Sequence, residues 1–252
     1  MEKKKSPEKK QKFTWKSLLE IIALPVWVTV VFVGVQYAAV FLGYFTLGLE
    51  KLQEPVWTTV LNAFIYALSV AIIVFVPVKL FKRWKTSREE LGLKGLPTWT
   101  DLLLAPVALV IYLVLASILV GVIAELFPGF DLEEAQDVGY NFLNSGLDRL
   151  VAFVALVILA PVAEELMFRG WLYGKLRAKI PGKASLVISV LIVSVLFGIL
   201  HGQWNVGINV FVMSLALCGL REITGTIYSG IFLHILKNCV AFMLLYVFNF
   251  GF

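Results

Sequence analysis

Charged residues, cysteine and histidine are all scarce in this chain of 252 residues. Only 15% of the residues are charged, against about 25% in ordinary soluble domains, and 60% are hydrophobic. There are two cysteines and two histidines. This composition excludes an ordinary soluble globular protein and predicts a polytopic membrane protein.

Several motifs that would point to other functions are also missing. The sequence contains no Gly-rich phosphate loop, no internal repeat and no nucleic-acid signature, and the net charge of +5 is explained by lysines and arginines in the tail and inner loops. We therefore expect no nucleic-acid partner. Cys218 and Cys239 lie in apolar segments outside any C-x-x-C motif, so we expect buried thiols without a disulfide.

Long apolar runs dominate what is present. Three uncharged windows can cross a bilayer core of about 30 Å, which takes about 20 helical residues; they are residues 21–49, 56–78 and 102–124. Later apolar segments are shorter or interrupted, at residues 150–163, 184–200, 206–220 and 223–252. We predict an all-α transmembrane bundle of about seven helices, give or take one, with a polar cavity formed by the C-terminal four.

The charge pattern predicts three segments and an orientation. Residues 1–16 form a basic tail that we expect to be disordered, residues 17–149 hold three transmembrane helices and an acidic outer loop, and residues 150–252 form a C-terminal helical core. Lys and Arg are frequent in alternate loops, which places the N-terminus and residues 79–101 and 170–183 on the cytoplasmic side and the C-terminus outside. The expected location is a bacterial cytoplasmic membrane.

Ionisable residues at membrane depth are costly, by about 2.5 to 3.5 kcal/mol at a helix centre on insertion scales, and so mark candidate functional positions. Here they are few, and both histidines of the chain are among them. With a neighbouring asparagine, the set is Glu164, Glu165, Arg169, His201, His234, Lys237 and Asn238.

Helical spacing divides the two adjacent glutamates. Glu165 and Arg169 are four residues apart and face one another, so a buried salt bridge that braces the helix is the natural pairing. Glu164 lies about 100° around the helix and has no partner there. An unpaired buried carboxylate is suited to act as a general acid or base. Pro161 frees a backbone carbonyl near this turn.

The remaining polar residues fall into two further pairs. Phe197 and His201 lie one turn apart on one helix face, where Phe197 is expected to pack. His234 and Asn238 share a face of the last helix and offer two donors toward one point, as an oxyanion site requires.

The motifs EExxxR (Glu164, Glu165, Arg169), FxxxH (Phe197, His201) and HxxxN (His234, Asn238) resemble the CPBP family of CAAX prenyl proteases and bacteriocin-processing enzymes, also called the ABI family. The resemblance covers about residues 150 to 245. It implies an intramembrane endopeptidase in which Glu164 and His201 activate a water. His234 and Asn238 would stabilise the oxyanion, while Glu165 and Arg169 would brace the helix.

Metal dependence stays open at this point. The resemblance is compatible with both a metalloprotease and a metal-free, glutamate-dependent protease. The sequence favours the metal-free mechanism, because no HExxH motif is present and Asn238 suits oxyanion binding better than zinc ligation. The alternative is a zinc protease with Glu164, His201 and His234 as ligands.

Two alternatives that are not proteases also remain, a non-catalytic immunity or scaffold protein and a transporter. The expected partners are the lipid bilayer and a peptide or protein substrate that arrives from the membrane or the cytoplasmic leaflet. The sequence does not indicate an oligomeric state.

One geometric difficulty accompanies this interpretation. If helices begin at residues 150 and 184, Glu164 lies about 21 Å below one surface and His201 about 26 Å above the other, so their depths differ. Convergence of these side chains requires that the first helix begin above the membrane, or that the second start below it or tilt.

Overall fold

The computed structural model describes residues 14–129, 140, 143 and 145–248. The disorder predicted for the N-terminal tail falls almost wholly outside these residues, and the first helix already begins at Trp15. The helices are α1 (Trp15–Leu47), α2 (Leu49–Leu52), α3 (Pro55–Lys79), α4 (Trp99–Leu126), α5 (Gly146–Phe153), η1 (Val154–Leu159), α6 (Ala160–Glu165), η2 (Leu166–Leu172), α7 (Tyr173–Lys179), α8 (Ser185–Ile199), α9 (Trp204–Thr224), α10 (Tyr228–Phe242) and η3 (Met243–Val247).

Among the described residues, six helices are long and apolar enough to cross a membrane, and the 15-residue helix α8 is a shorter apolar one. This result confirms the predicted all-α membrane bundle. The first three spans, α1, α3 and α4, agree with the three uncharged windows within a few residues. Both cysteines are free, although Cys239 is only half-buried.

The fourth span differs from the prediction. It is one helix of 34 residues, Gly146–Lys179, rather than a short segment that ends before the glutamates. A capping box begins it: Ser145 Oγ accepts from the backbone N–H of Asp148, whose carboxylate accepts from the N–H of Ser145, both at 3.0 Å. The helix therefore begins earlier than its apolar residues indicate.

Ion pairs explain why this helix also continues further than expected. Lys175 Nζ lies 2.7 Å from Glu90 Oε2, and Arg177 Nε lies 2.7 Å from Glu222 Oε1, so the charged residues at the end of the helix have partners. Residues 170–179, predicted to belong to a loop, are helical, and only residues 180–184 connect α7 to α8.

Two π-helical stretches, η1 and η2, interrupt the α-helical pattern of this central helix (α5 to α7) on either side of α6. A π turn shifts the hydrogen-bonding register by one residue, and such turns are common at functional sites. Here the segment between them, α6, contains Glu164 and Glu165.

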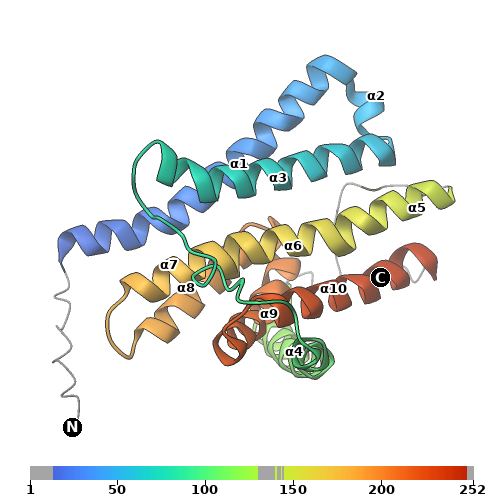
Figure 1. The fold of residues 1–252 in the computed structure, drawn as a ribbon. Helices are drawn as coiled ribbons and strands as arrows, with labels where there is room; N and C mark the ends of the chain where they lie inside the picture. The colour runs from blue at the N-terminus through green and yellow to red at the C-terminus, as the bar shows by residue number, and fades with distance from the viewer. Residues whose placement is uncertain (1–13, 130–139, 141–142, 144, 249–252) are drawn as a thin grey trace, which may run out of the picture.

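The central helix runs between two groups of helices (Figure 1). The antiparallel pair α1 and α3 packs on one side of it, and α10 packs on another side, followed by α9 and α4. Helices α8 and α9 approach closely at Gly198 and Gly207, where an added Cβ on Gly198 would lie 2.8 Å from the carbonyl oxygen of Gly207. This contact fixes the position of the turn that follows α8.

Candidate active site

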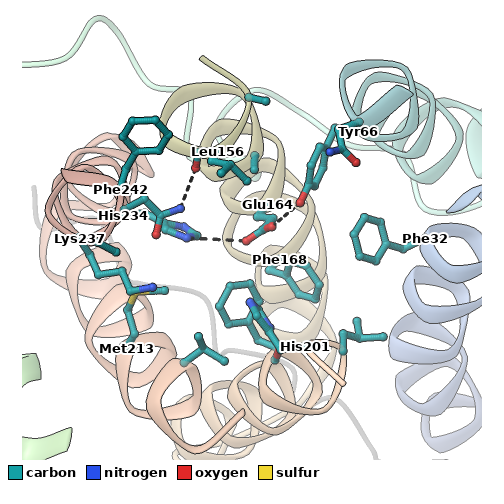
Figure 2. Close-up of a pocket in the computed structure, with 18 of the residues that line it drawn as sticks. Phe32, Tyr66, Leu156, Glu164, Phe168, His201, Met213, His234, Lys237 and Phe242 are labelled. Carbon is teal, nitrogen blue, oxygen red and sulfur yellow. Dashed lines mark hydrogen bonds and ion pairs between the residues drawn. The ribbon is translucent and has the colours of Figure 1, made fainter. Parts of the chain in front are cut away.

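A cavity of about 340 Å³ lies where these groups of helices meet (Figure 2). The predicted residues Glu164, Phe197, His201, His234 and Asn238 all line it, although they come from three separate stretches of the sequence. The chain's N-terminal helices also contribute to the wall, through Phe32 and Gln36 of α1 and Asn62 and Tyr66 of α3.

Glu164 has partners that its own helix does not supply. The hydroxyl of Tyr66 donates to Glu164 Oε1 at 2.8 Å, and His234 Nε2 lies 3.7 Å from Glu164 Oε2 (Figure 2). The carboxylate is therefore held between α3 and α10. Sequence reasoning missed Tyr66, because nothing in the spacing of the eight tyrosines distinguishes it.

Glu165 and Arg169 form the expected salt bridge, with Arg169 Nη1 3.0 Å from Glu165 Oε1 and both side chains fully buried. The guanidinium carbon of Arg169 also lies 4.2 Å from the centroid of the Phe197 ring, a cation–π contact. Gly230 on α10 leaves room for the glutamate, since a Cβ there would lie 3.0 Å from Glu165 Oε2. The pair thus joins the central helix to α8 and fits closely against α10.

Glu165 makes a second contact that helical spacing did not indicate. Its Oε1 atom lies 3.2 Å from His234 Nδ1. The two ring nitrogens of His234 therefore face two different carboxylates, Nδ1 toward Glu165 and Nε2 toward Glu164.

His201 lies in the turn directly after α8. Its Nδ1 atom is 2.7 Å from the carbonyl oxygen of Phe197, and the two rings meet edge to face with centroids 4.9 Å apart. The carbonyl can only accept, so Nδ1 carries the proton, and Nε2 of the neutral ring is left as a proton acceptor. No hydrogen-bond partner of Nε2 is found among the described residues.

The length of the central helix removes the predicted mismatch in depth. Measured from the short 180–184 connection, Glu164 lies about 22 Å from Lys179 and His201 lies about 24 Å from Ser185, at 1.5 Å per residue. Because α7 and α8 pack against each other on either side of this connection, the two side chains reach the same level and line one cavity. The central helix begins earlier than its apolar run, as one of the expected adjustments requires, and it also ends later, which was not expected.

Asn238 is tied to the π-helical turn η1. Its Nδ2 atom donates to the carbonyl oxygen of Leu156 at 2.9 Å. In π-helical register that carbonyl would accept from the N–H of residue 161, but Pro161 has no N–H. Asn238 thus satisfies a carbonyl left free by the proline, and its amide retains a second N–H.

Lys237 also lines the cavity, one residue before Asn238. No acidic side chain forms a salt bridge with it among the described residues. Its amine lies in the same cavity as the Glu164 carboxylate.

The described residues contain no group of three His, Cys, Asp or Glu side chains placed to hold a metal ion. Glu164 Oε1 is engaged by Tyr66 and His201 Nδ1 by the Phe197 carbonyl, which leaves Glu164 Oε2 and His201 Nε2 as the atoms available in the cavity. Glu164, His201 and His234 are not such a group of three in this structure, and we derive no step through a metal.

Residues 146–240 match the family model described as type II CAAX prenyl endopeptidase Rce1-like. The match begins with α5 and ends within α10, and it excludes α1, α3 and α4. It confirms the resemblance to the CPBP family in this part of the chain and supports the general class of CAAX-type intramembrane endopeptidases, which are peptide hydrolases. No curated protein and no solved structure matches the chain.

Proposed function

We propose that the protein is a metal-free intramembrane endopeptidase whose active site is the cavity around Glu164. The observation that carries this proposal is that Glu164, His201, His234 and Asn238, from three separate motifs, line one cavity. The family match to a peptide hydrolase supports the same class of reaction.

In the proposed mechanism, Glu164 Oε2 and His201 Nε2 hold a water in the cavity. Glu164 takes a proton from this water as the hydroxide attacks the scissile carbonyl carbon. The same proton then passes to the leaving amine as the C–N bond breaks. Atoms balance, since water supplies the hydroxyl of the new carboxyl group and the proton of the new amine.

The negative charge that develops on the carbonyl oxygen needs preorganised donors. His234 supplies one from Nε2 when both ring nitrogens are protonated, with Nδ1 donating to Glu165 at 3.2 Å. Asn238 supplies the second through the amide N–H that does not bind Leu156. Glu165 and Arg169 hold this arrangement without contact to the substrate.

The substrate is a peptide or a protein terminus that reaches the cavity from the membrane or the cytoplasmic leaflet. The name of the matching family makes a C-terminally prenylated peptide one candidate. The other candidates are a bacteriocin, a signalling peptide and another membrane-anchored protein.

The test is cleavage of internally quenched peptides, with and without a C-terminal prenyl group, by the full-length protein in proteoliposomes. Glu164→Gln and His201→Ala are each expected to lower kcat at least 100-fold, as loss of a general base does. Glu125→Gln, on the exposed end of α4, serves as the matched control and is expected to cleave like wild type.

Equal cleavage by wild type and both variants would contradict the proposal, because it would assign the activity to a contaminant. A properly folded wild-type protein that cleaves neither these peptides nor any component of the cell's membrane proteome would favour a non-catalytic immunity or scaffold protein instead.

A further inference from the structure

The hydrogen bond between Tyr66 and Glu164 joins the N-terminal helices to the candidate general base. We propose that Tyr66 is a positioning residue of the peptidase reaction, which holds one oxygen of Glu164 so that the other is directed at the water. This inference rests on the function proposed above. It assigns a role in the reaction to a residue outside the part of the chain that matches the family.

The two oxygens of Glu164 are divided between two sides of the cavity. Oε1 accepts from Tyr66 at 2.8 Å, the usual distance of a well-formed O–H···O hydrogen bond. Oε2 is 3.7 Å from His234 Nε2, too far for a direct hydrogen bond and open to a ligand in the cavity. Without Tyr66, rotation of the carboxylate would exchange the two oxygens.

Tyr66 is itself held in place by the N-terminal helices. Its ring packs against Phe32 of α1 with the centroids 5.9 Å apart, and α3 packs along both α6 and η1. Asn62, one helical turn earlier on α3, lines the same cavity. Helices α1 and α3 therefore form one wall of the active site, in addition to spanning the membrane.

The chemistry predicts a specific signature for loss of the hydroxyl. A hydrogen bond donated to a carboxylate stabilises its charged form, which is the form that accepts a proton from water. Removing the donor therefore lowers kcat by about 10- to 100-fold, the range for a hydrogen bond to a charged group, with KM nearly unchanged.

The test compares Tyr66→Phe with Tyr112→Phe in the proteoliposome cleavage assay. Tyr112 is the matched control, because it is a buried tyrosine of α4 that does not line the cavity. We expect Tyr66→Phe to lower kcat with KM nearly unchanged, and Tyr112→Phe to change neither. Identical kcat and KM values in the two variants would overturn the assignment.

A second measurement needs no substrate. Tyr66→Phe and Glu164→Ala each remove one partner of the hydrogen bond, so their effects on the free energy of unfolding in detergent should be less than additive in the double variant. Tyr112→Phe combined with Glu164→Ala should be additive. Additivity in both pairs would show that Tyr66 does not act through Glu164.

Failure of this inference is distinct from failure of the proposed function. If Glu164→Gln is inactive while Tyr66→Phe behaves like the Tyr112 control, the peptidase site stands and the role of Tyr66 is wrong. If Glu164→Gln cleaves like wild type, the proposed function is wrong, and the proposed role of Tyr66 is then wrong as well.

Discussion

His234 Nδ1 lies 3.2 Å from Glu165 Oε1, so a histidine of α10 is held by a glutamate of the central helix. The same oxygen lies 3.0 Å from Arg169 Nη1. Glu165 is therefore both half of a buried salt bridge and the group that orients a candidate oxyanion donor. The two roles predict different effects on stability and on catalysis when Glu165 is replaced.

Replacing Glu165 with alanine is expected to lower the free energy of unfolding by about 3–5 kcal/mol, because it leaves the Arg169 guanidinium buried without a counter-charge. Chemical unfolding in detergent micelles measures this loss. Glu165→Met combined with Arg169→Met should restore much of the stability, since no unpaired charge remains.

Peptide cleavage by this double variant separates the two roles. Because His234 still lacks its acceptor, kcat should stay at least tenfold below wild type even where stability has returned. Full recovery of both stability and kcat would mean that Glu165 acts only as a brace.

Much of this site could be predicted from the sequence because its geometry is local. The Glu165–Arg169 pair follows from four-residue spacing, and the Phe197–His201 contact follows from one helical turn. Ionisable groups are costly in a membrane unless they are buried in protein or hydrated. This cost predicted that Glu164 and the two histidines would meet in one cavity.

The contacts between distant segments could not be predicted. Tyr66 lies 98 residues before Glu164, and no periodicity relates the two. Asn238 binds the carbonyl of Leu156, which is free only because a π-helical turn places it opposite Pro161. A π turn has no sequence signature of its own. The sequence therefore could not predict that the Leu156 carbonyl would accept a hydrogen bond from Asn238.

The extent of the central helix was missed for a related reason. The apolar pattern stops where charged residues begin, but Lys175 and Arg177 find acidic partners on other segments and remain helical. Hydropathy records the composition of one segment and carries no information about partners elsewhere in the chain.

The close approach of α8 and α9 at Gly198 provides another prediction. A methyl group at this position would lie 2.8 Å from the backbone oxygen of Gly207, which cannot move without its helix. Gly198→Ala should therefore push the two helices apart and displace His201, three residues further on. We expect lower stability in chemical unfolding and a loss of kcat of about tenfold or more, since misplacement by about 1 Å can cost 100-fold.

The control for this variant is Gly219→Ala, a helical glycine of α9 with open space around its Cβ position. It should be neutral or stabilise the protein by about 0.5–1 kcal/mol, the usual gain from replacing glycine inside a helix. If Gly198→Ala behaves like Gly219→Ala in both stability and cleavage, the contact does not position His201.

Chelation discriminates between the two proposed protease mechanisms. No group of three His, Cys, Asp or Glu side chains placed to hold a metal is found among the described residues, so we expect Glu164 and His201 to act on water directly. Dialysis against 1,10-phenanthroline and EDTA should leave peptide cleavage within about twofold of the untreated protein. Metal analysis of the dialysed sample must confirm that zinc has been removed.

Loss of cleavage on chelation, followed by its return when stoichiometric zinc is added, would instead assign Glu164, His201 and His234 as metal ligands.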